Sequence, residues 1–126
     1  MQQSTSILEL VKSIKTQIQE CDIFHIKSML DQDKLDGILV DVREEQEFCN
    51  SHIPGATHLS RGIIDVKIEH LIPNKQQKIY LYCAAGLRSA LSAESLQRIG
   101  YNNVISIDGG FGHWVQNKFD TSNGDI

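Results

Sequence analysis

The fold of this chain is decided by residues 78–89, which read Lys78-Ile79-Tyr80-Leu81-Tyr82-Cys83-Ala84-Ala85-Gly86-Leu87-Arg88-Ser89. The apolar and aromatic run at 79–82 predicts a buried strand that ends at Cys83. The small residues that follow predict a tight loop, since Gly86 adopts a positive φ without steric cost. A helix is expected from Arg88. Strand, loop and helix together place a thiol beside backbone N–H groups at a helix N-terminus, which favours an anion on sulfur.

Outward from this segment, the sequence alternates between strand and helix patterns. Strands are expected at residues 23–26, 38–42, 57–59, 79–82 and 104–107. Helices are expected at residues 6–18, 27–32, 44–50, 62–70, 88–99 and 111–117. This alternation predicts an α/β fold with a mainly parallel sheet. In such folds ligands bind just beyond the carboxyl ends of the strands, where Cys83 is expected.

The length of 126 residues predicts one folded domain. We expect a helical extension at residues 1–20, the domain at 21–120 and a polar, frayed tail at 121–126. The extension carries apolar residues at helical spacing, at Ile7, Val11, Ile14 and Ile18. These predict a helix packed on the domain surface, with a partner-binding helix as the alternative.

Composition narrows the classes of function. The chain has 16 acidic and 12 basic residues and a net charge of −4, which argues against a nucleic-acid partner. No apolar run approaches the ~18 residues of a membrane span, and no secretory signal is evident. The three cysteines form no CxxC pair, so neither a zinc site nor a disulfide framework is expected. We therefore expect a soluble, cytoplasmic protein with no metal, no cofactor and no membrane partner.

Cys83 is the candidate nucleophile. The alternative is a structural cysteine buried in the core. The small-residue loop and the following helix argue against this alternative. No histidine lies at a sequence spacing from Cys83 that would indicate a catalytic pair, so the sequence supports no cysteine–histidine triad. We therefore expect backbone dipoles, in place of a histidine base, to activate the Cys83 thiol as a nucleophile. The absence of a base also favours a reaction whose leaving group needs no proton.

Four segments carry a family resemblance. They are Asp41-Val42-Arg43 with Glu47-Phe48, His52-Ile53-Pro54-Gly55-Ala56, Cys83-Ala84-Ala85-Gly86-Leu87-Arg88-Ser89, and Gly109-Gly110 with Trp114. Together they resemble the single-domain rhodaneses, a sulfurtransferase family, over about residues 22–119. The resemblance implies a rhodanese-like central five-stranded parallel sheet with helices on both faces.

The resemblance also implies a ping-pong reaction through a persulfide on Cys83. A small sulfur donor such as thiosulfate would load the cysteine, and cyanide, a thiol or a protein cysteine would accept the sulfur. The outer sulfur would be held by backbone N–H groups of the loop, at Ala84, Ala85, Gly86, Leu87 and Arg88. The amides would stabilise a negatively charged sulfur in the way that an oxyanion hole stabilises a negatively charged oxygen.

Further residues are expected near the site, with roles in binding or in structural support. The Arg88 side chain would either attract an anionic donor or brace the loop. Arg61 would contact substrate or acceptor, or be an ordinary surface arginine. Asp41 and Arg43 are expected to form a structural ion pair. Ser89 is expected to hydrogen-bond at the helix N-terminus.

The residue after the cysteine departs from the family pattern. Ala84 stands where thiosulfate-using enzymes often place a basic residue, which weakens thiosulfate as the physiological donor.

Three rival functions fit parts of the same pattern. Phosphatases and arsenate reductases of the related fold have a CX5R loop, whereas four residues separate Cys83 from Arg88. That shorter loop suits one sulfur better than a phosphate. The second rival is a dedicated persulfide carrier, and the third is a non-catalytic binding module.

Overall fold

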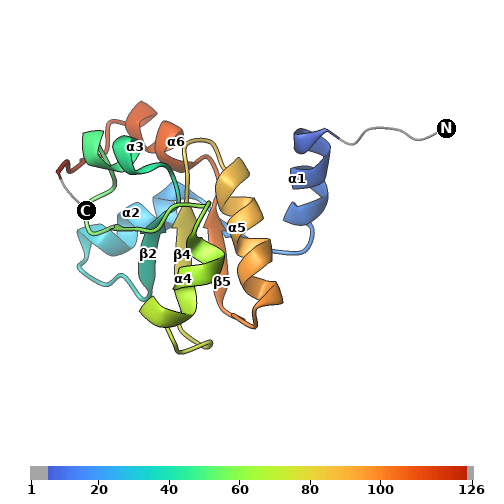
Figure 1. The fold of residues 1–126 in the computed structure, drawn as a ribbon. Helices are drawn as coiled ribbons and strands as arrows, with labels where there is room; N and C mark the ends of the chain where they lie inside the picture. Colours follow the sequence, from blue (N-terminus) through green and yellow to red (C-terminus); the bar gives the residue numbers. More distant parts are fainter. Residues whose placement is uncertain (1–5, 125–126) are drawn as a thin grey trace.

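The computed structural model describes residues 6–124 and contains the predicted α/β fold (Figure 1). A five-stranded sheet has the order β1-β5-β4-β2-β3, and every neighbouring pair is parallel. Its strands are β1 (Gln19–Cys21), β2 (Ile38–Asp41), β3 (Thr57–His58), β4 (Ile79–Tyr82) and β5 (Val104–Ile107). Because all strands point the same way, their carboxyl ends form one edge of the sheet.

Helices cover both faces of the sheet. On one face lie α4 (Ile64–Leu71) and α5 (Leu87–Arg98), and on the other α2 (Ile23–Asp31) and α6 (Gly110–Gln116). Side chains of β4 alternate between these layers: Ile79 and Leu81 join the α4/α5 core, Tyr80 and Tyr82 the α2/α6 core. Cys83 continues the alternation and lies in the α4/α5 core.

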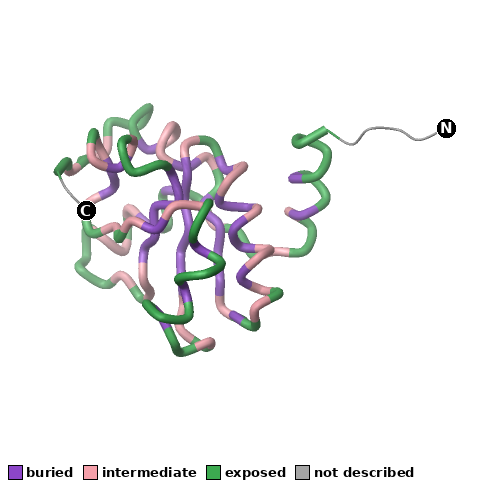
Figure 2. The backbone as a smooth tube through the Cα atoms, viewed as in Figure 1, coloured by how far each residue is buried: buried purple, intermediate pink, exposed green. Residues whose placement is uncertain are grey.

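Helix α1 (Ile7–Lys15) packs against α5, on the side of α5 that faces away from the sheet (Figure 2). Ser6 begins the helix by accepting a hydrogen bond from the Glu9 amide at 3.1 Å. Val11 and Ile14 are buried against Ala90 of α5. The helix predicted at residues 6–18 therefore exists but ends at Lys15.

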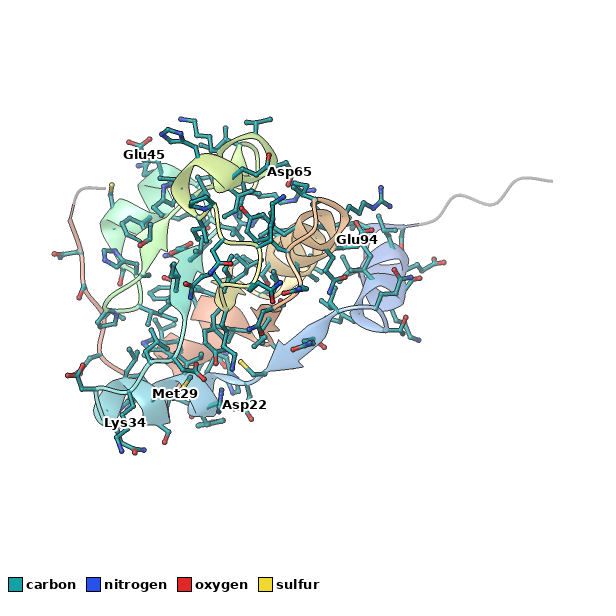
Figure 3. All side chains as sticks on the ribbon, turned by 90° about the horizontal axis from the view of Figure 1, so that it is seen from below. Asp22, Met29, Lys34, Glu45, Asp65 and Glu94 are labelled. Carbon is teal, nitrogen blue, oxygen red and sulfur yellow. The ribbon has the colours of Figure 1, made fainter. Side chains whose placement is uncertain are left out.

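The expected strand at residues 23–26 is wrong. Those residues begin α2, because the Asp22 carboxylate accepts from the His25 amide at 2.9 Å and caps a helix there. Figure 3 labels Asp22 where β1 passes into α2. The strand in this region is instead β1, which pairs Gln19 to Cys21 with Ile105 to Ile107.

The C-terminal segment is tied down as far as Gly124, contrary to the expected frayed tail. Ser122 exchanges two backbone hydrogen bonds with His52, at 2.8 and 2.9 Å, and the Gly124 amide donates to the Cys49 carbonyl at 3.0 Å. These contacts attach the segment to α3 (Glu45–Asn50) and the residues after it. Residues 125–126 and residues 1–5 lie outside the described part of the chain, and the predicted division at residues 20 and 121 stays a prediction.

Membrane insertion through a helix finds no support in residues 6–124: none of their helices has both the length and the apolar character that a membrane crossing needs.

Truncation of the buried side of α1 tests how the helix is held. Ile14→Ala should lower the free energy of unfolding by about 2 kcal/mol, because Ile14 is 6% exposed and leaves a cavity beside Ala90. Leu8→Ala on the same helix, at a position 65% exposed, should change it by less than about 0.5 kcal/mol. Urea titration of both variants measures the difference, and equal effects would contradict this packing.

Candidate active site

The candidate site is the loop that joins β4 to α5 at the carboxyl edge of the sheet. Cys83 follows the last residue of β4, and α5 starts at Leu87. Gly86 is the N-cap of α5 and has φ 103°, a left-handed conformation that favours glycine. The chain thus reverses within three residues, and the open N-terminus of α5 faces back toward the cysteine.

The sulfur of Cys83 lies inside this turn. Its Sγ accepts from the Gly86 amide at 3.1 Å and from the Ser89 amide at 3.4 Å, and lies 3.6 Å from the Ser89 hydroxyl. Amide donors and the positive end of a 12-residue helix favour negative charge at this position. Cys83 is only 1% exposed, so the thiol lies deeper in the turn than the sequence suggests.

The remaining loop residues make no hydrogen bond to Sγ. Ala84 is half-buried and Ala85 is exposed. Leu87 packs partly against the cluster that joins α1 to α5. In the first turn of a helix the amides have no intrahelical acceptor, so those of Leu87 and Arg88 point out of the N-terminus of α5.

A second backbone segment supports the loop from the α6 side. The amides of Phe111 and Gly112 donate to the carbonyls of Cys83 and Ala84 at 2.7 and 2.8 Å. The approach is close because Gly110, at φ 53°, has no side chain; a Cβ there would collide with the Cys83 carbonyl oxygen. The Gly109-Gly110 pair therefore lets α6 begin directly against the loop.

The Arg88 side chain is held in an ion pair. Its guanidinium donates to both carboxylate oxygens of Glu47 in α3, at 2.7 and 3.2 Å. This pairing lowers the pKa of Glu47 and keeps the carboxylate ionised. This ion pair is the contact that a bracing role of Arg88 requires, and the role itself stays a prediction.

Asp41 and Arg43 form a buried ion pair at the end of β2. They are 0% and 5% exposed, and the Arg43 guanidinium lies 2.8 Å from a carboxylate oxygen of Asp41. The same guanidinium donates to the Ser51 carbonyl and stacks 4.2 Å from the ring centre of Phe111. The pair thus links β2 to the start of α6, the segment that supports the Cys83 loop.

The Arg61 guanidinium makes its contacts with α4 and α5. Its guanidinium lies 3.6 Å from Asp65 of α4 and 3.4 Å from the Ser95 hydroxyl of α5, while its Nε is buried without a partner among the described residues. Ser95 lies seven residues beyond Arg88, about 10 Å along the helix. The structure therefore brings Gly86, Arg88 and Ser89 around Cys83 and leaves Arg61 between α4 and α5.

Two partners at the site were missed from the sequence. Glu47 was seen only as part of a motif, because its pairing with Arg88 is a contact between distant segments. Ser106, a buried residue of β5, donates to the Ser89 hydroxyl at 2.9 Å. A lone serine in the apolar strand Val-Ile-Ser-Ile was the available signal, since a buried hydroxyl needs a partner.

Within residues 6–124, no histidine ring hydrogen-bonds to Cys83 Sγ. A ring nitrogen of His52 lies 2.8 Å from the Phe48 carbonyl, and one of His58 lies 2.7 Å from the Arg43 carbonyl. Across residues 6–124, no three cysteine, histidine or acidic side chains gather as ligands for a metal ion.

Comparison with known proteins agrees with this geometry. Residues 25–117 match the rhodanese-like domain family. The putative sulfur carrier protein YrkF of Bacillus subtilis is 33% identical over 98 residues, 78% of this chain and 51% of that protein. The thiosulfate sulfurtransferase GlpE of Pseudoalteromonas translucida is 34% identical over 84 residues, 65% of this chain and 76% of that protein. This chain thus spans about half the length of the first relative.

A solved structure from Rhodopseudomonas palustris has nearly the same extent. It is described as a protein of unknown function and possible tyrosine phosphatase, with TM-score 0.85 and 26% identity, covering 97% of this chain and 99% of that one. With the family match over most of its length, this chain belongs to the rhodanese-like family, whose named relatives here include sulfurtransferases and a sulfur carrier.

Two positive-φ glycines test the support of the loop. Gly110→Ala should lower the free energy of unfolding by at least about 3 kcal/mol, because φ strain adds to a collision with the Cys83 carbonyl. Gly55→Ala, at φ 87° with open space around it, should lower it by only about 1 kcal/mol. Thermal or urea unfolding compares them; a Gly110 variant as stable as the Gly55 variant would show that α6 does not press on the loop.

Proposed function

We propose that this protein is a sulfurtransferase that carries sulfane sulfur as a persulfide on Cys83. The observation that carries the proposal is the sulfur itself, held by the Gly86 and Ser89 amides at the N-terminus of α5. A thiolate is the nucleophilic form of cysteine, and these donors stabilise it without a histidine base.

The reaction has two displacements. The Cys83 thiolate attacks the outer sulfur of thiosulfate: the Sγ–S bond forms, the donor S–S bond breaks, and its electron pair leaves with sulfite. An acceptor nucleophile, such as cyanide, a thiol or a protein cysteine, then attacks the outer sulfur. The Sγ–S bond breaks and its pair returns to Cys83 as the thiolate. Neither leaving group requires a proton.

The outer sulfur carries the negative charge of the persulfide. We assign its stabilisation to the loop amides of Ala84, Ala85, Leu87 and Arg88, with those already on Sγ holding the inner atom. One preorganised donor of this kind contributes about 3 kcal/mol to a transition state. Because Cys83 is 1% exposed, entry of a donor sulfur requires the loop to open slightly.

The identity of donor and acceptor is a finer proposal. Ala84 leaves the position after the cysteine uncharged, and Arg88 is paired with Glu47, so neither side chain draws a dianion such as thiosulfate to the loop. We keep Arg61 as a contact for arriving anions or acceptors, remote from the reacting sulfur. A persulfide carrier serving a protein acceptor is the alternative, favoured by the name of the Bacillus subtilis relative.

The state of the cysteines bears on the cellular compartment of the protein. All three cysteines are unpaired, which is typical of proteins in a reducing compartment. We therefore propose that the protein acts in the cytoplasm.

Cys83→Ser tests the catalytic assignment. It should abolish thiocyanate formation from thiosulfate and cyanide, because a hydroxyl in place of the thiol forms no persulfide, and circular dichroism should show an intact fold. Cys49→Ser is the matched control and should retain activity. Turnover of an aryl phosphate that depends on Cys83 would instead favour the phosphatase alternative, in agreement with the description of the Rhodopseudomonas palustris protein.

Mass spectrometry tests the site of sulfur loading. Treatment with a sulfane-sulfur donor at pH 8 should add about 32 Da at Cys83. Burial raises the pKa of Cys21 to about 12, so at pH 8 its thiolate is scarce and Cys21 should stay unmodified. Sulfur found on Cys21 or Cys49 and absent from Cys83 would overturn the proposal.

A further inference from the structure

A chain of buried hydroxyls runs from β5 to the active cysteine. Ser106 is fully buried in β5, between apolar neighbours, and its hydroxyl donates to the Ser89 hydroxyl at 2.9 Å. Ser89 is also fully buried, and its hydroxyl lies 3.6 Å from Cys83 Sγ. Burial of a hydroxyl is unfavourable unless it is hydrogen-bonded, so each serine depends on the other.

Strand geometry explains how Ser106 reaches this place. β4 and β5 are parallel neighbours, with Leu81 paired to Ser106. The side chain of Ser106 shares the face of Val104, which lies in the core beneath α4 and α5 together with Leu81 and Cys83. Ser106 thus lies under the first turn of α5, directly behind Ser89.

When Cys83 is a thiolate, the number of protons that the two serine hydroxyls can donate determines the direction of their hydrogen bonds. A hydroxyl has one proton to donate and accepts through its lone pairs. When Ser106 donates to the Ser89 oxygen, the proton of Ser89 is free to turn to the one nearby acceptor that has gained a charge, Cys83 Sγ. Ser106 polarises Ser89 in the same direction, which strengthens that bond.

We propose that Ser106 is a positioning residue that acts through the Ser89 hydroxyl to stabilise negative charge on the inner sulfur, Cys83 Sγ. The proposal rests on the persulfide reaction proposed above, and it assigns the two sulfur atoms of the persulfide to different stabilising groups. Loop amides stabilise the outer sulfur of the persulfide, whereas the serine pair stabilises Sγ when it is the attacking thiolate and again when it is the leaving group.

The second displacement is the step that the serine pair should affect most. When the acceptor removes the outer sulfur, the electron pair of the Sγ–S bond returns to Sγ, and a better-stabilised thiolate leaves faster. The first displacement is less sensitive, because a less stabilised thiolate is scarcer but intrinsically more nucleophilic.

Ser106→Ala is the central variant. Protein loaded with sulfane sulfur is mixed with cyanide, and single-turnover discharge should be roughly five- to tenfold slower than in the wild type. The ultraviolet absorbance of the thiolate in unloaded protein, at one fixed pH, should fall as well. Ser106→Thr keeps the hydroxyl and should restore both values toward the wild type.

Ser92→Ala is the matched control. Ser92 is a fully buried serine of the same helix, but its hydroxyl donates to the Arg88 carbonyl at 2.8 Å and lies outside the chain to the sulfur. Its loss should change stability with little effect on discharge or thiolate absorbance. Equal slowing in both variants would mean that any buried hydroxyl lost from this region disturbs the loop, and would overturn the proposal.

A double variant guards against a purely structural effect. If Ser106 acts through Ser89, then Ser106→Ala in a Ser89→Ala background should slow discharge no further. Additive slowing would contradict the proposal. Wild-type protein that fails to load sulfur would overturn the persulfide reaction itself, whereas a loaded wild type that discharges no faster than Ser106→Ala overturns only the role of Ser106.

Discussion

Two hydrogen bonds, from the amides of Gly86 and Ser89 to Cys83 Sγ, are the interaction on which the rest of the site depends. They exist only because the chain turns left-handed at Gly86 and starts α5 at once. The supporting contacts all act on this turn: α6 holds its carbonyls, Arg88 ties it to α3 through Glu47, and the Asp41–Arg43 pair anchors the start of α6.

The electrostatics of the site are local. The protein has a net charge of −4, so its overall field does not attract an anionic sulfur donor. Arg43 and Arg88 are each held by a carboxylate, and at the same edge Lys15 lies 2.9 Å from Asp108. In the proposed reaction, negative charge on sulfur is therefore stabilised by oriented amides and hydroxyls. These amides are already oriented toward the sulfur before it gains charge, which is the basis of electrostatic preorganisation.

The sequence predicted the fold and singled out Cys83 as the candidate nucleophile, because both have short-range signals. Strands β2, β4 and β5 are mostly apolar, with Asp41 at the end of β2 and Ser106 within β5. The loop is a run of small residues after a cysteine. The polar strand β1 has no such signal, since Gln19 and Glu20 are exposed and depend on pairing with β5. Likewise the Asp22 cap, rather than apolar periodicity, starts α2. Three contacts join residues that lie far apart along the chain: Arg88 with Glu47, Arg61 with Ser95, and Ser89 with Ser106. Only the folded structure shows these three pairs.

A crystal structure of donor-treated protein tests the central claim most directly. It should show one extra sulfur atom bonded to Cys83 Sγ, within hydrogen-bonding distance of amide nitrogens in the turn before α5. An unmodified Cys83, or an added sulfur that points away from those amides, would contradict the view that main-chain donors hold the transferred atom.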